Sequence, residues 1–357
     1  MMADLMKYMP TFRGRQEELK VLTSFKFGHK IYPCVEILKE ADNRRKVPRT
    51  FEQIYLPIIR KVSAPFVFID LPVHYQETNQ TSREILEFLL GTIRNRRKRT
   101  DYILKLSSLS KKIIPVISTY SIYSNEDNTI IKQEADLRKV FPIIGFRTFA
   151  ISFMDDMKEI EKCIQPNDYL IVDLLNEEPQ LLNSSFREVN EYLKRFEFCK
   201  KIILRSSINK NIVNNKLDHG KKVEEIDNNL INTFAAYNSD AFGDYAGIKK
   251  EDVTDGGGIS PGFLYYDATE NNFYGYKGRK NELSTFETII VPDVLHSEAT
   301  HRMNTSAFLS DDNFGWAILV EIYEQHESGK SQAKFKDIAM YHYLHCLKMK
   351  IEKGDFG

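Results

Sequence analysis

Short apolar runs alternate with amphipathic stretches along the first two thirds of the chain. The runs are rich in Ile, Val and Phe, and both of their alternating faces carry apolar residues. Strands that are buried on both faces, as parallel strands are, have this pattern. Six runs of this kind are clear: residues 31–37, 66–70, 113–117, 147–152, 169–173 and 201–205.

The stretches between the runs have helical periodicity. Apolar residues recur at intervals of three and four within residues 51–62, 85–93 and 186–196. Strand and helix therefore alternate from about residue 30 to residue 240. This alternation predicts βαβ units that share one parallel sheet.

Two further runs complete a set of eight strands. Residues 239–247 form one, and residues 262–266 form another that can pair with residues 273–276 as a hairpin. We therefore expect a TIM-like (β/α)-barrel. If residues 8–11 are also a strand, the late hairpin lies outside the barrel. The alternative is an open doubly wound sheet, which is disfavoured because no early strand is followed by a glycine-rich turn.

The last 60 residues have helical periodicity without strand signals. Two apolar stripes recur at helical spacing: Trp316, Leu319, Val320 and Tyr323, and then Phe335, Ile338, Ala339, Tyr343 and Leu347. We expect residues 1–290 to form the barrel domain and residues 291–357 to form a C-terminal helical extension packed on it.

Composition and charge narrow the class of protein. The 357 residues include 50 basic and 50 acidic side chains, so a surface that is basic throughout, as in many nucleic-acid-binding proteins, is not expected. No apolar run reaches the roughly 18 residues of a membrane helix, and the first ten residues lack a signal-peptide core. The four cysteines are isolated from one another, which favours reduced thiols and a cytoplasmic protein.

Ionisable residues fall at the ends of the predicted strands. Glu36, Asp70, Asp173 and Asp244 lie at or near four such ends. In a barrel these ends converge on one mouth, where active sites of this architecture lie. Carboxylate oxygens are the ligands that Mg²⁺ and Mn²⁺ prefer, so the four acids are candidate metal ligands. The simpler interpretation is that each acid only caps the following helix or faces solvent.

Other residues near the same ends suggest ligand binding or proton transfer. Arg205 ends another strand and can grip a phosphate or carboxylate as a fork. His74 lies four residues after Asp70 and is a candidate general acid or base. Tyr245 stands between Gly243 and Gly247, where the backbone either approaches a ligand closely or ends a strand that needs glycine.

Two weaker signals lie elsewhere in the chain. A basic run at the end of a predicted helix is either a solvated helix end or a contact for nucleic-acid phosphates; it comprises Arg94, Arg96, Arg97, Lys98 and Arg99. His342, His345 and Cys346 are spaced to supply zinc ligands from one helix, but no fourth ligand is evident and their apolar neighbours favour a packing helix.

Several short motifs resemble a known family when they are taken in order. They are Tyr8-Met-Pro-Thr-Phe-Arg-Gly14, Tyr32-Pro-Cys-Val-Glu-Ile37, Phe242-Gly-Asp-Tyr245, Ile259-Ser-Pro261, Leu264-Tyr-Tyr266 and Phe273-Tyr-Gly-Tyr-Lys-Gly278. The chain resembles the bacterial and phage "beta protein" family across most of its length. The resemblance implies a barrel-like α/β fold and a place in mobile elements or phage-defence neighbourhoods. It implies no particular reaction.

Three hypotheses about function follow. The first is a component of bacterial anti-phage defence that binds a phosphorylated or nucleic-acid ligand at the barrel mouth. The second is a non-catalytic sensor or scaffold whose late segment, about residues 280–357, contacts a partner protein encoded nearby. The third is a metal-dependent phosphodiesterase or nuclease. In it, Glu36, Asp70, Asp173 and Asp244 hold Mg²⁺ or Mn²⁺, Arg205 grips the phosphate and His74 transfers the proton.

Overall fold

The fold is described from a computed structural model of the chain. The description covers residues 6–40, 49–73, 83–118, 124–180, 183–250 and 260–356. By their contacts these residues form two compact units. Within the described ranges, the first comprises residues 6–205 and Thr233–Asp244, and the second comprises Ser206–Asn232, residues 245–250 and residues 260–356.

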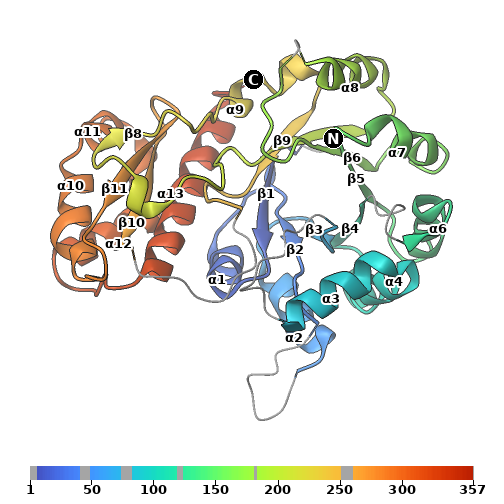
Figure 1. The fold of residues 1–357 in the computed structure, drawn as a ribbon, viewed down its shortest axis with the longest axis horizontal. Helices are drawn as coiled ribbons and strands as arrows, with labels where there is room; N and C mark the ends of the chain where they lie inside the picture. The colour runs from blue at the N-terminus through green and yellow to red at the C-terminus, as the bar shows by residue number, and fades with distance from the viewer. Residues whose placement is uncertain are drawn as a thin grey trace. The chain divides into compact units, whose positions relative to one another are not determined.

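A closed barrel forms the centre of the first unit (Figure 1). Among the described residues, eight parallel strands pair in the order β1-β2-β3-β4-β5-β6-β7-β9, and β9 pairs back onto β1. The strands are β1 (Tyr8–Arg13), β2 (Cys34–Glu36), β3 (Val67–Asp70), β4 (Ile113–Ser118), β5 (Gly145–Phe149), β6 (Tyr169–Asp173), β7 (Lys200–Leu204) and β9 (Ala241–Asp244). The predicted parallel barrel is therefore confirmed.

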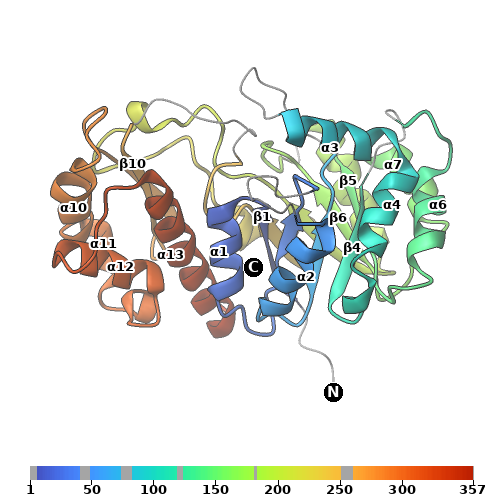
Figure 2. The same cartoon turned by 90° about the horizontal axis from the view of Figure 1, so that it is seen from below.

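Helices follow most of the strands and cover the outside of the barrel (Figure 2). Before β9 in the chain comes the short α9 (Leu230–Thr233). The helices around the barrel are α1 (Gln16–Ser24), α2 (Phe51–Lys61), α3 (Arg83–Arg94), α4 (Arg96–Leu104), α6 (Thr129–Leu137), α7 (Phe153–Ile160) and α8 (Ser184–Arg195). α2 packs an apolar face inward that includes Phe51, Tyr55 and Ile59. A capping box at Thr50 and Gln53 fixes where α2 begins.

The strand at Tyr8–Arg13 closes the barrel, and the late hairpin lies outside it. β1 bridges β2 and β9, so the run at residues 8–11 is a barrel strand. In the second unit, β10 (Gly262–Asp267) pairs antiparallel with β11 (Asn272–Lys277), as the predicted hairpin does. β11 also pairs with β8 (Lys221–Lys222), which gives the sheet order β10-β11-β8.

Helices complete the second unit around this small sheet. They are α10 (Val291–Leu295), α11 (Glu298–Met303), α12 (Phe314–Tyr323) and α13 (Gln332–Lys353), so the C-terminal helical extension is present. α13 packs against β10 and α12. The unit also contains residues 206–232, because β8 comes from the segment between β7 and β9. Its composition therefore differs from the division expected at residue 290. None of the described helices is long and apolar enough to span a lipid bilayer.

Gly243 is required by the closure of the barrel. It lies opposite Met9 in the pairing of β9 with β1. A Cβ atom at Gly243 would lie 2.8 Å from the carbonyl oxygen of Met9 and 3.1 Å from the side chain of Leu204. The first distance is too short for any side chain, so the strands approach this closely only because residue 243 is glycine.

We predict that Gly243→Ala destabilises the barrel by about 1–3 kcal/mol, because the new methyl group forces β1 and β9 apart. Gly91→Ala is the matched control: its Cβ would meet only the flexible end of Lys98, and alanine favours the interior of α3. Urea unfolding followed by far-UV circular dichroism measures both. Equal stability of the two variants would show that the close approach does not limit the barrel.

Candidate functional site

The carboxyl end of the barrel carries acidic side chains that face inward. Glu36 and Asp70 are the last residues of β2 and β3 and lie opposite one another in register. Cys34 and Phe68, two residues earlier on the same strands, also lie opposite one another. Because side chains alternate along a strand, all four share one face. The ring of Phe68 contacts the ring of Tyr169, on β6 across the barrel, which identifies that face as the interior.

Arg147 of β5 reaches across the interior to these acids. Its Nη1 donates to Glu36 Oε1 at 2.9 Å and to Asp70 Oδ2 at 2.6 Å. Its Nε and Nη2 donate to Asp173 Oδ2, at the end of β6, at 3.2 and 2.6 Å. One guanidinium thus joins the carboxylates of three different strands.

Further donors contact these carboxylates. Arg13 of β1 pairs with Glu36 at 3.3 Å, and Arg99 of α4 pairs with Asp70 at 3.2 Å. The hydroxyl of Ser118 donates to Asp70 Oδ1 at 2.8 Å. The backbone N–H of Leu175 donates to Asp173 Oδ1 at 2.8 Å. We call Arg13, Glu36, Asp70, Arg99, Arg147 and Asp173 the mouth cluster.

Charge is balanced within the mouth cluster. The side chains of its three arginines and three carboxylates are each 5% exposed or less. Burying this many charges costs several kcal/mol per ion unless each is paired and hydrogen-bonded. Burial and the nearby Asp70 carboxylate raise the pKa of the Cys34 thiol well above its ordinary value, so the thiol stays protonated beside the cluster.

The three carboxylates are arranged around a guanidinium rather than around a metal ion. Glu36, Asp70 and Asp173 converge as expected, but Arg147 lies where they meet and takes an oxygen from each. A divalent cation at that point would stand next to a fixed positive charge, and its ligands would have to give up charge-assisted hydrogen bonds. The cluster therefore supplies its own counter-charge for these acids.

The structure does not bring Asp244 to the other acids. Gly243 faces Met9 and Leu204 inside the barrel, so Asp244 points to the opposite face of β9. There its carboxylate accepts a hydrogen bond of 2.5 Å from the hydroxyl of Tyr8. Tyr245 belongs to the second unit, where it is buried with the Lys250 ammonium 4.8 Å from its ring centre.

Arg205 lies directly after β7, at the same end of the barrel as the mouth cluster. Its backbone N–H donates to the carbonyl of Gly243 at 3.0 Å, which ties the end of β7 to β9. Its guanidinium lies 3.5 Å from Glu178, a carboxylate that is 49% exposed. This ion pair is longer and more exposed to solvent than any ion pair in the mouth cluster.

The basic run divides between the protein interior and the surface. Arg96 and Arg99 are buried; Arg96 pairs with Glu126 at 3.1 Å and Asp136 at 2.9 Å, and Arg99 belongs to the mouth cluster. Arg94, Arg97 and Lys98 are exposed. His74, the expected proton-transfer group, lies outside the described residues.

The histidine pair on α13 packs within the second unit. Both ring nitrogens of His342 have partners: Nδ1 accepts from the side-chain amide of Asn313, and Nε2 donates to the carbonyl of Tyr266, each at 2.8 Å. The ring stacks on Tyr265, with centroids 4.8 Å apart. His342 is therefore held by hydrogen bonds rather than available to zinc.

Comparison with known families agrees with the motifs along the chain. A family model described as Beta protein matches residues 8–347. The chain belongs to the Beta protein family. No curated protein and no solved structure matches the chain at a significant level.

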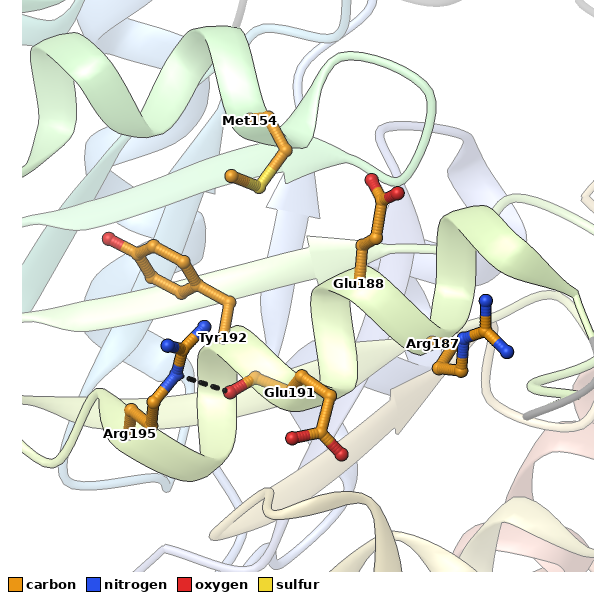
Figure 3. Close-up of a pocket in the computed structure, with 6 residues that line it drawn as sticks. All are labelled: Met154, Arg187, Glu188, Glu191, Tyr192 and Arg195. Carbon is orange, nitrogen blue, oxygen red and sulfur yellow. Dashed lines mark hydrogen bonds between the residues drawn. The ribbon is translucent and has the colours of Figure 1, made fainter.

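The match to the Beta protein family spans every barrel strand and most of the second unit. It therefore includes the mouth cluster, and also a shallow groove on the helical layer outside the barrel. Figure 3 shows this groove, with Met154 of α7 above the residues of α8. Its volume is about 230 Å³, and it is lined by Met154, Arg187, Glu188, Glu191, Tyr192 and Arg195. None of the predicted site residues lines it.

Sequence reasoning missed the roles of Arg147 and Arg13. Arg147 begins a predicted strand, and Arg13 lies two residues after another. Each stands two residues from an interior position: Arg147 from Gly145, whose Cβ would touch Phe68, and Arg13 from Thr11, which lies opposite Cys34. The sequence did carry one indication of these roles: an arginine on the inward-facing side of a buried strand is unusual.

We predict that Arg147→Met destabilises the barrel by about 3–5 kcal/mol, because it leaves buried carboxylates without their shared partner. Adding Asp173→Asn should recover part of this loss, since it removes one of those charges. Denaturant unfolding of the single and double variants measures the effect. A loss below about 1 kcal/mol would mean that the carboxylates do not depend on Arg147.

We also predict that the second unit loses stability in mild acid. Burial lowers the pKa of His342 to about 4 and also lowers that of His345. The unfolded chain takes up protons below pH about 6.5, and the folded His342 only below about 4, so the free energy of unfolding falls by about 3 kcal/mol between these values.

Urea unfolding followed by the fluorescence of Trp316, which lies in the second unit, tests this. His342→Gln should remove most of the pH dependence, and His296→Gln, at an exposed position, should keep it. An unchanged slope in His342→Gln would assign the pH dependence to other groups.

Proposed function

We propose that this protein binds a phosphorylated ligand, a nucleotide or a nucleic-acid end, at the carboxyl end of its barrel, as a component of bacterial anti-phage defence. The observation that carries the proposal is the gathering of four arginines at that end. Arg13, Arg99 and Arg147 come from β1, α4 and β5, and Arg205 directly follows β7. The side chain of each is 5% exposed or less.

This arrangement costs folding free energy, and its presence despite that cost supports a functional role. Barrel interiors are normally filled by branched apolar side chains, and replacing buried ion pairs with apolar residues is often neutral or stabilising. Clusters of buried ionisable groups at the carboxyl ends of barrel strands are characteristic of functional sites.

Within this end, Arg205 is the group best suited to exchange partners. The mouth cluster is charge-balanced and its carboxylates are fully buried, so we expect its ion pairs to stay in place when a ligand binds. Arg205 instead pairs at 3.5 Å with the half-exposed Glu178. An ion pair with a half-exposed carboxylate contributes little free energy. A doubly charged phosphate therefore displaces the carboxylate and binds the guanidinium in a bidentate way.

The defence part of the proposal depends only on the resemblance noted in the sequence, which implies mobile elements and phage-defence neighbourhoods. The metal-dependent phosphodiesterase has less support, because Arg147 occupies the point where three of its four expected ligands meet.

We expect Arg205→Ala to weaken binding of a phosphorylated ligand more than tenfold while leaving the melting temperature nearly unchanged. Glu178→Gln should strengthen binding, because it removes the competing carboxylate. Calorimetric titration with a panel of nucleoside phosphates, cyclic nucleotides and short DNA and RNA strands measures both changes.

The matched control is Arg195→Ala, at an exposed arginine on α8. It should retain ligand affinity, and cells that carry it should retain protection in a phage plaque assay that Arg205→Ala abolishes. No binding across the panel, or equal affinity of Arg205→Ala and the unmodified protein, would contradict the proposal.

A further inference from the structure

Three exposed cations of the basic run lie close together where α3 ends and α4 begins. Arg94 is in the last turn of α3, and Arg97 and Lys98 are in the first turn of α4. All three are exposed. We call these three residues the basic patch. α3 and α4 pack against each other on the outside of the barrel (Figure 2).

The basic patch lies at the carboxyl end of the barrel. Arg97 and Lys98 stand between Arg96 and Arg99 within one turn of α4. Arg99 reaches inward to the mouth cluster, and Arg96 pairs at 3.1 Å with Glu126, in the segment that follows β4. Residues three apart share one face of a helix, and the two between them point away from it. The same turn of α4 therefore supports the mouth cluster on its inner side and presents two cations on its outer side.

Arg97 and Lys98 lie at the end of a helix where cations are unfavourable. The first turn of α4 contains no acidic residue, and the macrodipole makes this end of a helix positive. The same dipole favours Arg94, which ends α3. A solvated helix end therefore explains Arg94 but not Arg97 and Lys98. Their position costs helix stability, which points to a role outside folding.

The basic patch has no internal counter-charge in the part of the chain that the structure describes. No carboxylate there forms an ion pair with any of its three residues, whereas the exposed Arg83, also on α3, pairs with Glu87 at 2.7 Å. Asp101, an exposed carboxylate one turn further along α4, pairs with neither Arg97 nor Lys98. The three cations are therefore available to an external anion.

We propose that the basic patch binds the sugar–phosphate backbone of a nucleic acid whose phosphorylated end is held at the barrel mouth. The proposal rests on the proposed function and narrows its ligand from any phosphorylated nucleotide to the end of a strand. A free nucleotide at Arg205 would place no phosphate on the outer side of α4. A strand carries a further phosphate at each nucleotide beyond its end, and these phosphates attract exposed Lys and Arg.

The surface around the basic patch is suited to phosphates rather than to bases or lipids. The aromatic residues of α3 and α4, Phe88 and Tyr102, are buried, so neither ring is available for base stacking. None of the exposed large apolar side chains of the described residues lies on α3 or α4, whereas membrane-binding helices insert such side chains beside their cations. The contacts should therefore be independent of base sequence and sensitive to salt.

The double variant Arg97→Gln with Lys98→Gln tests the proposal in the full chain. Its melting temperature should not fall, because the change removes cations from the positive end of α4. Its affinity for short DNA or RNA duplexes with phosphorylated ends, measured by fluorescence anisotropy at low salt, should fall about tenfold for at least one of the two. For DNA, the slope of log affinity against log salt concentration should decrease in magnitude by about 1.8, since each phosphate contact contributes about 0.9.

Two comparisons separate the basic patch from the barrel mouth. The affinity for a nucleoside monophosphate should be unchanged in the double variant and reduced in Arg205→Ala. The matched control is Lys194→Gln with Arg195→Gln, which removes two exposed cations from α8 of the same unit. It should bind the duplexes as tightly as the unmodified protein does.

Equal duplex affinity of the double variant and the matched control, with the nucleotide still bound, would overturn this proposal and leave the proposed function standing. So would duplex binding that Arg205→Ala does not weaken, because the end of the strand would then not be held at the mouth. Binding to anionic phospholipid vesicles but to neither duplex would assign the basic patch to a membrane surface instead. No binding of duplex or nucleotide would contradict both proposals.

Discussion

The shared ion pairing of Arg147 is the interaction on which the carboxyl end of the barrel depends. Glu36, Asp70 and Asp173 end three strands and are buried in the barrel interior, where unpaired carboxylates would not stay charged. One guanidinium from a fourth strand meets all three. The positions of Arg13 and Arg99 follow from the same requirement, because two of these acids need a second cation.

Most of the barrel could be predicted from sequence, because its strands are short, apolar on both faces and separated by amphipathic helices. The sequence did not settle which of the apolar runs close the barrel. Tyr8–Arg13 and Gly262–Asp267 are both plausible strands, and only pairing across the sheet assigns the first to the barrel and the second to the hairpin. β8 is two residues long, too short to give any pattern, and so its segment could not be assigned to the second unit.

The site could be predicted only in part, because side-chain direction depends on the parity of each strand. The convergence of Glu36, Asp70 and Asp173 follows from their places at the ends of parallel strands. Asp244 ends a strand too, but the inward position of β9 belongs to Gly243, which turns Asp244 to the other face. Arg147 lies within an apolar run, and its partners are separated from it by up to 111 residues, so no local pattern identifies them.

A titration with Mn²⁺, followed by electron paramagnetic resonance, tests most directly whether a guanidinium is the counter-charge at the barrel mouth. It should use a Glu324→Gln background, which weakens the exposed group of Glu321, Glu324 and His326 as an alternative site. We predict that the ion keeps the spectrum of free Mn²⁺ at micromolar protein, because Arg147 already takes an oxygen of each carboxylate. Stoichiometric Mn²⁺ binding that Asp173→Asn abolishes would contradict this account.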